Sequence, residues 1–260
     1  MEQQIIGLIA AMPEEIKPLL KLIGTYDRSA AAGFNLYRFD IDGKSCRLIE
    51  SGMGTRRAAK ATEALISLER PDHIISFGFG GAVQPGMVVG DLAVAGSSLL
   101  YQGRRPGASE AIVLAVSDKV RLRLEAICKK LGYTAWQGNF LTSGEILSKK
   151  ELAETLRQQD AVNPVLDMET WAIAQVTARE EIPLLAIRAI SDAAEEELGF
   201  SISEFVDSEM NIRIYKILGT IARKPWIISQ LIRLAGNSRI AGRNLAAVVK
   251  ELLVKDMASE

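Results

Sequence analysis

The 260-residue sequence predicts an α/β fold in which a mostly parallel β-sheet is covered by helices on both faces. Patterns typical of strands and of helices alternate along the chain. Two apolar runs, residues 5–11 and 183–187, lack polar alternation, as expected of strands that are buried on both faces. Acidic residues follow these runs, at the position where open α/β sheets bind ligands. The sequence therefore predicts a functional site at the carboxyl edge of the sheet.

The first part of the chain contains a strand pair and two helices. Pro13 favours the start of a helix, because its fixed backbone angle suits the first turn. Asp42-Gly43 lies between two strand patterns and is typical of a two-residue hairpin turn. The predicted elements are a strand at 4–11, a helix near 14–24, strands near 34–41 and 44–50, and a helix near 55–69.

The middle of the chain continues the alternation without an internal repeat or a low-complexity tract. A polar loop containing Gly103 and Gly107 interrupts it once. The predicted elements are strands near 73–78 and 91–97, a helix near 118–131, a strand near 134–142, a helix near 149–158, a strand at 164–167, a helix near 169–180 and a strand at 183–190.

The composition is that of an ordinary globular domain. At 48% apolar residues the chain can bury a full core, and no Pro/Gly/Ser-rich linker divides it. The net charge of −1 gives no general attraction to nucleic acid. No apolar run approaches the ~18 residues of a membrane span, and the N-terminus lacks the pattern of a signal peptide. We therefore expect a cytoplasmic protein that does not bind nucleic acid.

The cysteine and histidine content argues against metal sites. Cys46 and Cys128 lie far apart and resemble the small buried residues that free cysteines usually are, in a reducing compartment. His73 is the only histidine, and a structural role suits its position before a strand better than catalysis. Zinc-type ligand spacing and Ser-His-Asp catalysis are disfavoured. No metal or cofactor is expected.

The C-terminal stretch differs in charge from the rest of the chain. Between Lys216 and Lys255 there are eight basic residues against one acid, so this segment carries +7 and the remainder −8. Residues 226–234 form a basic amphipathic helix pattern after Pro225. Such a helix packs on its own domain or a partner subunit, or else lies on a membrane surface. We therefore divide the chain into a catalytic domain, 1–222, and a basic amphipathic helical extension, 223–260.

Two acidic segments mark the end of predicted strands. Residues 166–170 (Leu-Asp-Met-Glu-Thr) and 188–192 (Arg-Ala-Ile-Ser-Asp) each place a carboxylate after an apolar run. Taken singly, Glu169 and Asp192 are also explained as acids at helix starts. A third acid pair, Glu14 and Glu15, follows the first strand.

Together with residues 51–54 (Ser-Gly-Met-Gly) and 76–81 (Ser-Phe-Gly-Phe-Gly-Gly), these segments resemble the purine nucleoside phosphorylase and methylthioadenosine/adenosylhomocysteine nucleosidase superfamily. The resemblance runs from residue 5 to about residue 218. It implies a three-layer α/β fold with a central mixed, partly barrel-like β-sheet flanked by helices. It also implies a homodimer that binds a small adenine nucleoside without a cofactor.

The resemblance implies roles for the acids in cleaving an N-glycosidic bond. Asp192 matches the general acid of the family's Ser-Asp motif, where Ser191 precedes it, and would protonate purine N7. Glu169 matches the acid that binds the sugar hydroxyls, and Met168 would pack against the sugar. Arg188 either holds Glu169 or a sugar oxygen, or belongs to a structural ion pair.

Glu15 bears on whether the bond is cleaved by water or by phosphate. In the nucleosidases the acid of the Met-x-x-Glu turn activates water, and a carboxylate repels phosphate. Glu15 also fits a simple first-turn acid of a helix. Gly54 belongs to a turn that the family uses near the sugar or phosphate, and the following Arg56 and Arg57 keep a phosphorylase open as the alternative.

Two positions depart from the family pattern. Phe79 precedes Gly80 in the Gly-rich loop beneath the nucleoside, where nucleosidases usually carry a small polar residue. Leu147 stands in place of the aromatic residue that stacks on the base. Residues 166–169 and the tail are similar to the hopanoid-associated branch, which implies release of adenine from an adenosyl-substituted hopane lipid. A nucleoside-binding or membrane-associated protein without catalysis is the second alternative.

Overall fold

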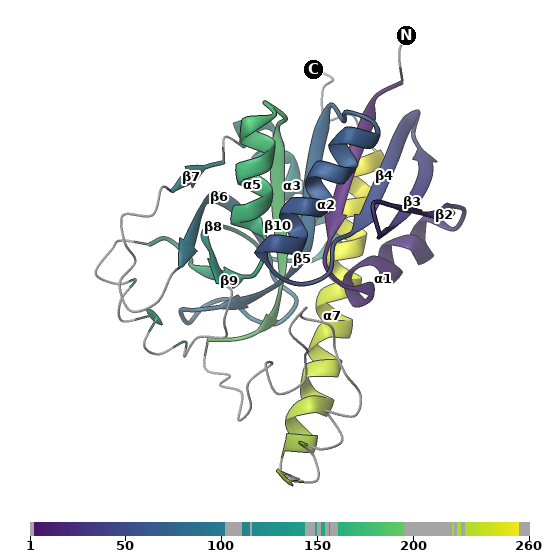
Figure 1. Ribbon diagram of the computed structural model, residues 1–260. Helices are drawn as coiled ribbons and strands as arrows, with labels where there is room; N and C mark the ends of the chain where they lie inside the picture. Colours follow the sequence, from purple (N-terminus) through teal and green to yellow (C-terminus); the bar gives the residue numbers. More distant parts are fainter. Residues whose placement is uncertain are drawn as a thin grey trace.

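The sheet at the centre of the molecule is partly closed (Figure 1). The computed structural model describes residues 3–101, 111–114, 116–143, 149, 152–153, 156, 161–194, 220, 223–224 and 227–254. The strands run in the order β10-β6-β8-β9-β5-β1-β4-β3-β2, and a further pairing of β10 with β5 closes five of them into a ring. These five are β5 (His73–Ala82), β6 (Leu92–Tyr101), β8 (Ala135–Ser143), β9 (Val165–Asp167) and β10 (Leu184–Asp192). The prediction of a mixed, partly barrel-like sheet is confirmed.

The prediction that the sheet is mostly parallel is wrong, because five of the ten pairings between the described strands are antiparallel. The ring contains two antiparallel seams, β5 with β9 and β10 with β6. Between these seams the neighbours are parallel: β6 with β8, β8 with β9, and β10 with β5. Alternation of helix and strand patterns favours parallel pairing between successive strands, but it carries no information on the directions in which a ring closes.

The remaining strands extend the sheet from β5 and form two hairpins. They are β1 (Ile5–Ala10), β4 (Lys44–Glu50), β3 (Phe34–Ile41) and β2 (Asp27–Ala31), and the short β7 (Ile112–Val113) pairs with β6. The β3–β4 hairpin turns at Asp42-Gly43 as predicted, with positive φ at both residues. The sequence did not predict β2. It is a largely exposed edge strand, and its turn places Ala32 at φ 49°, a conformation that the residue type does not signal.

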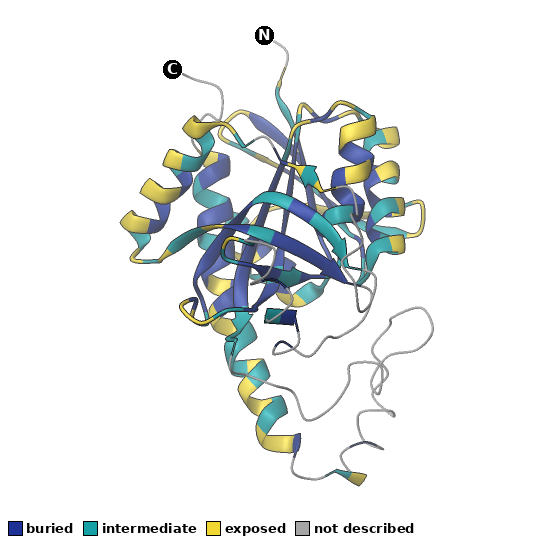
Figure 2. Ribbon diagram, turned by 90° about the vertical axis from the view of Figure 1, so that its left-hand side faces the viewer, coloured by how far each residue is buried: buried dark blue, intermediate teal, exposed yellow. Residues whose placement is uncertain are grey.

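Helices cover both faces of the sheet. α2 (Thr55–Leu68) and α5 (Thr170–Arg179) pack together on one face. α1 (Pro13–Ile23), α3 (Asp118–Leu131) and α7 (Ile227–Val254) cover the other face. Figure 2 shows the buried sheet between these exposed helices. The predicted polar loop and most of the helix predicted near 149–158 lie outside the described residues.

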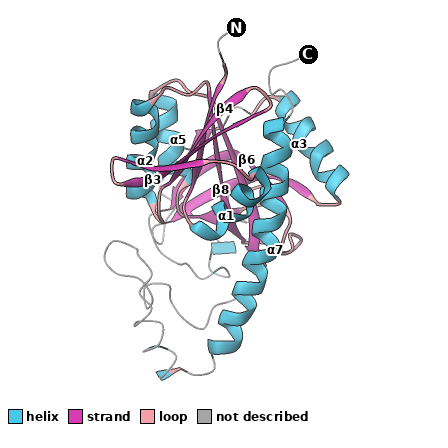
Figure 3. Ribbon diagram, turned by 90° about the vertical axis from the view of Figure 1, so that its right-hand side faces the viewer, coloured by secondary structure: helices cyan, strands magenta, loops and turns pink. Residues whose placement is uncertain are grey.

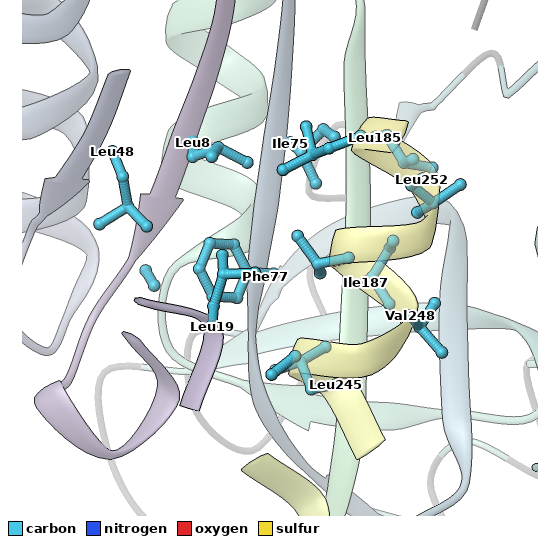
Figure 4. Packing of buried hydrophobic residues seen from close by; sticks show 14 of the residues in the cluster. Leu8, Leu19, Leu48, Ile75, Phe77, Leu185, Ile187, Leu245, Val248 and Leu252 are labelled. Atoms are coloured by element: carbon cyan, nitrogen blue, oxygen red, sulfur yellow. The ribbon is translucent and has the colours of Figure 1, made fainter. Parts of the chain in front are cut away.

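The long C-terminal helix α7 has two different halves. In its second half Leu245, Val248 and Leu252 are fully buried and face strands β5 and β10 (Figure 4). Each such side chain contributes about 1.5–3 kcal/mol of hydrophobic stabilisation. The first half projects away from the sheet (Figure 3), and Ile228 and Ile232 are exposed there. The division at residue 222 stays a prediction, but the second half of α7 belongs to the core of the sheet domain.

The described residues were expected to lack a membrane span, a metal site and a reactive cysteine. No described helix is long and apolar enough to cross a membrane. Among the described residues there is no group of three His, Cys, Asp or Glu side chains arranged to hold a metal ion. Cys46 and Cys128 are free and buried, and burial raises the pKa of each thiol to about 12, so neither is a reactive thiolate at neutral pH.

Candidate active site

The carboxyl edge of the parallel strands β4, β1, β5 and β10 gathers most of the predicted site residues. Strand β1 ends at Ala10 and leads into the first turn of α1, which carries Glu15. Strands β5 and β10 run parallel beside it, so that Gly78 is paired with Arg188 and Gly81 with Asp192. Residues far apart in sequence thus meet at one edge of the sheet, as predicted.

Glu15 is buried and its carboxylate accepts three backbone N–H groups. Oε2 accepts from Ala11 at 2.8 Å and Met12 at 2.9 Å, and Oε1 accepts from Phe79 at 2.8 Å. Burial raises the pKa of this carboxyl, while the backbone hydrogen bonds and the charge of Arg188 oppose the rise. A carboxylate with a raised pKa is a better general base than an ordinary glutamate.

Glu169 approaches the same place from the start of α5. Its Oε1 accepts a hydrogen bond of 2.8 Å from the backbone N–H of Gly54, the residue before α2. Burial first, and then the negative charge of Asp167, raise the pKa of Glu169, and Arg188 opposes them. Gly54 therefore acts in the structure as a partner of Glu169, at a turn where its φ of 94° suits glycine.

Arg188 is a member of a buried ion pair. It is 2% exposed, its Nε donates a hydrogen bond of 3.1 Å to Asp167 Oδ2, and its Nη2 forms an ion pair of 2.9 Å with the same oxygen. It also donates to Thr170 Oγ1 at 2.8 Å and Ser76 Oγ at 3.2 Å. Of the two predicted roles, these contacts favour the structural ion pair, and the hydrogen bonds of the described residues do not join Arg188 to Glu169. Asp167, its partner, was not predicted as a site residue.

A small cavity joins these groups. It has a volume of about 10 Å³, close to the space of one water molecule. Its polar lining includes the side chains of Glu15, Glu169, Arg188, Ser51 and Ser76. The cavity therefore offers one water-sized position between two carboxylates and a guanidinium.

Asp192 lies farther along the same strand edge. Asp192 is paired with Gly81, which lies about 10 Å beyond Gly78 along β5 at the rise of a strand. The β5–β10 register shifts between Ile190 and Asp192, which leaves Ser191 without a partner in the register; such irregularities redirect side chains near active sites. Ser191 Oγ donates to Asp192 Oδ1 at 2.7 Å, and the Asp192 side chain is 22% exposed.

Lys149 is the second contact of Asp192, and the sequence prediction missed it. Its ammonium forms a close ion pair with Asp192 Oδ2 and donates to the backbone carbonyl of Ala193 at 2.7 Å. The signal was present, because Lys149 shares a helical face at i, i+3 and i+7 with Leu152 and Leu156. Lysine is so common on solvated surfaces that the position alone did not suggest a buried partner.

Phe79 and Gly80 of the Gly-rich strand make contacts with the core and with Arg188 that the sequence did not predict. Phe79 packs its side chain against the core cluster that contains the second half of α7, so its described contact with the site is the backbone N–H that binds Glu15. A Cβ atom at Gly80 would lie 2.6 Å from Val165 Cγ1 and 3.1 Å from Arg188 Cβ, which shows that close packing requires glycine there. A contact of either residue with substrate stays a prediction.

The other predicted residues are placed less directly. Met168 is half-buried beside Glu169, and its contact with a sugar stays a prediction. Leu147 lies outside the described residues. Arg57 folds back on its own turn, where Nε donates to Ser51 O at 3.0 Å, and Arg56 is exposed. His73 begins β5 at the end opposite to the site.

The chain is similar in sequence to a known protein superfamily. The model of the phosphorylase superfamily matches residues 5–223. The chain belongs to this superfamily. A 5′-methylthioadenosine/S-adenosylhomocysteine nucleosidase of Haemophilus influenzae (strain PittGG) is 30% identical over 230 residues, which cover 84% of this chain and 99% of that protein. The nucleosidase of the same name from Halalkalibacterium halodurans is 30% identical over 212 residues, with 78% and 91% covered.

Solved structures share the fold of this member of the superfamily. The nucleosidase of Neisseria meningitidis in complex with methylthio-immucillin-A has a TM-score of 0.73 at 20% identity, covering 96% of this chain and 99% of the other. A futalosine hydrolase of Helicobacter pylori has a TM-score of 0.71 at 20% identity, with the same coverage of both chains. The relatives named here are hydrolases and nucleosidases, not phosphorylases.

Proposed function

We propose that this chain is a purine nucleosidase, which hydrolyses the N-glycosidic bond of a 5′-substituted adenosine and releases free adenine. The observation that carries the proposal is the cavity of one-water size between Glu15, Glu169 and Arg188. An acid on the sheet edge about 10 Å away, Asp192, leaves room for the sugar and base between the two ends of the site. The homologous nucleosidases support the reaction class.

The reaction divides among three acids. Water in the cavity attacks C1′ of the sugar while Glu15 takes its proton. The bond between C1′ and N9 breaks, and Asp192 gives a proton to N7 so that neutral adenine leaves. Glu169 accepts hydrogen bonds from the sugar hydroxyls, which strengthen as positive charge develops on the ring. The proton balance closes with one proton taken up by Glu15 and one given by Asp192.

The same contacts argue against the phosphorylase alternative. Glu15 and Glu169 line the position of the nucleophile, and Glu15, ionised as a general base, would repel an anionic phosphate there. Of the two basic residues that kept this alternative open, Arg57 donates to the backbone of its own turn and Arg56 is exposed.

The test is a panel of adenine nucleosides with different 5′ groups in phosphate-free buffer, read by free adenine. We expect release from at least one of them, and Asp192→Asn should remove that release while the protein stays folded. The panel includes methylthio, homocysteinyl and adenosylhopane-type lipid groups, which separates the substrate classes implied by the sequence. Calorimetric binding of every nucleoside without product would instead favour a binding protein that lacks catalysis.

We further propose a cellular compartment, an oligomeric state and a lipid contact for this chain. Free, buried Cys46 and Cys128 support a reducing, cytoplasmic compartment. We expect a homodimer from the family resemblance, with light scattering as the measurement. The exposed Ile228, Ile232 and Arg239 on the projecting half of α7 support contact with a lipid surface.

Lipid contact is testable without shortening the chain, because truncation before α7 would remove core residues. We expect the wild type to co-sediment with anionic vesicles and the double variant Ile228→Ser, Ile232→Ser to lose this binding. Leu68→Ser, at an exposed apolar residue on α2, is the matched control and should bind like the wild type. Absence of wild-type binding would dismiss the lipid contact.

A further inference from the structure

Lys149 is a buried cation whose described hydrogen bonds all go to the end of β10. Its side chain is 8% exposed, and its ammonium contacts Asp192 Oδ2, Asp192 O at 3.3 Å and Ala193 O at 2.7 Å. A buried ammonium group is costly unless it is paired and hydrogen-bonded. The three acceptors belong to two successive residues, so the cation holds both the backbone and the side chain of Asp192.

The position of Lys149 is fixed from the other side by the core. Leu152 and Leu156, on the same helical face, are 1% and 2% exposed and pack in a cluster with Val83 and Leu141. This anchors the segment against β8 and the residue that follows β5, and β5 is paired with the strand that carries Asp192. The lysine therefore connects two parts of the site: the segment after β8, which the family resemblance assigns to base binding, and the acid at the end of β10.

The carboxyl group of Asp192 is held at both oxygens. Ser191 donates to Oδ1 and Lys149 to Oδ2, and each oxygen keeps a further lone pair, one of which can carry the proton that Asp192 gives to the base. Gly81 makes room for this arrangement, because a Cβ atom there would lie 2.7 Å from Asp192 Oδ2. Rotation of the carboxyl group away from its position would break one of two charge-assisted contacts.

We propose that Lys149 is a positioning residue for leaving-group protonation, which holds the Asp192 carboxyl group where it meets the purine base. The proposal rests on the proposed nucleosidase function. Lys149 then affects the departure of the base, and it does not affect the attack of water on the sugar. Misplacing a catalytic group by about 1 Å can cost on the order of 100-fold in rate.

The experiment compares two substrates with the same sugar. One is 5′-methylthioadenosine, whose adenine must be protonated to leave; the other carries 4-nitrophenol on the same 5-methylthioribose, and its anion leaves without a proton. Lys149→Met removes the ammonium and keeps the length of the side chain. We expect kcat for the adenine substrate to fall about 10- to 100-fold, because Asp192 is still present but misplaced. This is less than the full effect of about 100- to 10,000-fold that general acid catalysis contributes, and kcat for the nitrophenyl substrate should stay within about threefold.

Further variants make the outcome specific. Asp192→Asn should show the same selectivity, and the double variant should be no slower than Asp192→Asn alone, because the two residues act as a unit. Lys149→Arg retains the charge and should restore part of the lost rate. Lys129→Met, on the exposed surface of α3, is the control for the lysine-to-methionine change. Activity of Lys149→Met on the nitrophenyl substrate shows that its pocket is folded.

Three results would overturn the inference: equal loss on both substrates, an unchanged rate with the adenine substrate, or additive effects in the double variant. If Lys149→Met does not fold, selective loss in Lys149→Arg supports the inference and unselective loss overturns it. A wild type that releases no adenine from any nucleoside rejects the proposed function itself, and the role of Lys149 with it.

Discussion

The buried ion pair of Asp167 and Arg188 provides a quantitative test of what supports the site. Asp167→Asn keeps the shape of the side chain but leaves the guanidinium of Arg188, 2% exposed, without its counter-charge. Breaking a buried pair by removing one partner costs about 3–5 kcal/mol. Part of this cost is offset, because Asp167 is one of the charges that raise the pKa of Glu169. In the variant Glu169 ionises more readily near Arg188, so we expect a loss close to the lower limit, about 3 kcal/mol.

Urea unfolding at neutral pH measures this loss as a change in the free energy of unfolding. The matched control is Arg179→Met, which removes an exposed arginine that pairs with Glu63 and Glu180. Exposed ion pairs contribute about 0–1 kcal/mol, so this control should change little. A loss below about 1 kcal/mol in Asp167→Asn, equal to the control, would refute the claim that burial makes the Asp167–Arg188 pair essential.

The contacts of Gly81, Glu169 and α7 can each be tested by substitution. Gly81→Ala places a Cβ atom 2.7 Å from Asp192 Oδ2 and should lower kcat about 10-fold or more; Gly236→Ala, with no atom near its Cβ, should leave kcat unchanged. Burial raises the pKa of Glu169, so the wild type should lose stability as pH rises from the ordinary value of 4.5 through the raised pKa, and Glu169→Gln should flatten this slope in urea unfolding at several pH values; parallel slopes would contradict the shift. Leu245→Ala, in the buried half of α7, should cost about 2–5 kcal/mol, whereas Ile232→Ala, in the exposed half, should stay within about 0.5 kcal/mol; similar losses would contradict the two-part description of α7.

The sequence predicted those parts of the fold that have a local signature. Asp42-Gly43 marked its hairpin because both residues suit positive φ. Apolar runs marked β1 and β10, and the acids after them marked the edge of the sheet where Glu15 and Asp192 lie. The family resemblance supplied the closure of the barrel, which depends on the pairing of β10 with β5 and is not a property of either strand alone.

The features that the sequence left open depend on contacts between distant residues. The pattern of α7 showed an apolar face, but not that only its second half would be covered by the sheet domain. Phe79 was assigned to the pocket from its position beside Gly80, and the sequence did not show that its side chain also packs against the core cluster that contains Phe77. Arg188 was left between two roles, since the choice depends on the buried position of Asp167, 21 residues away.

In the proposed reaction water, not phosphate, attacks the sugar. The most direct measurement is the rate of adenine release from 5′-methylthioadenosine, or from the best substrate of the panel, while inorganic phosphate is raised from zero to about 50 mM. ³¹P NMR of the products detects any sugar phosphate. We expect free sugar and adenine at a rate that does not depend on phosphate, because Glu15 and Glu169 line the position of the nucleophile. A rate that requires phosphate, with a sugar 1-phosphate as product, would contradict it.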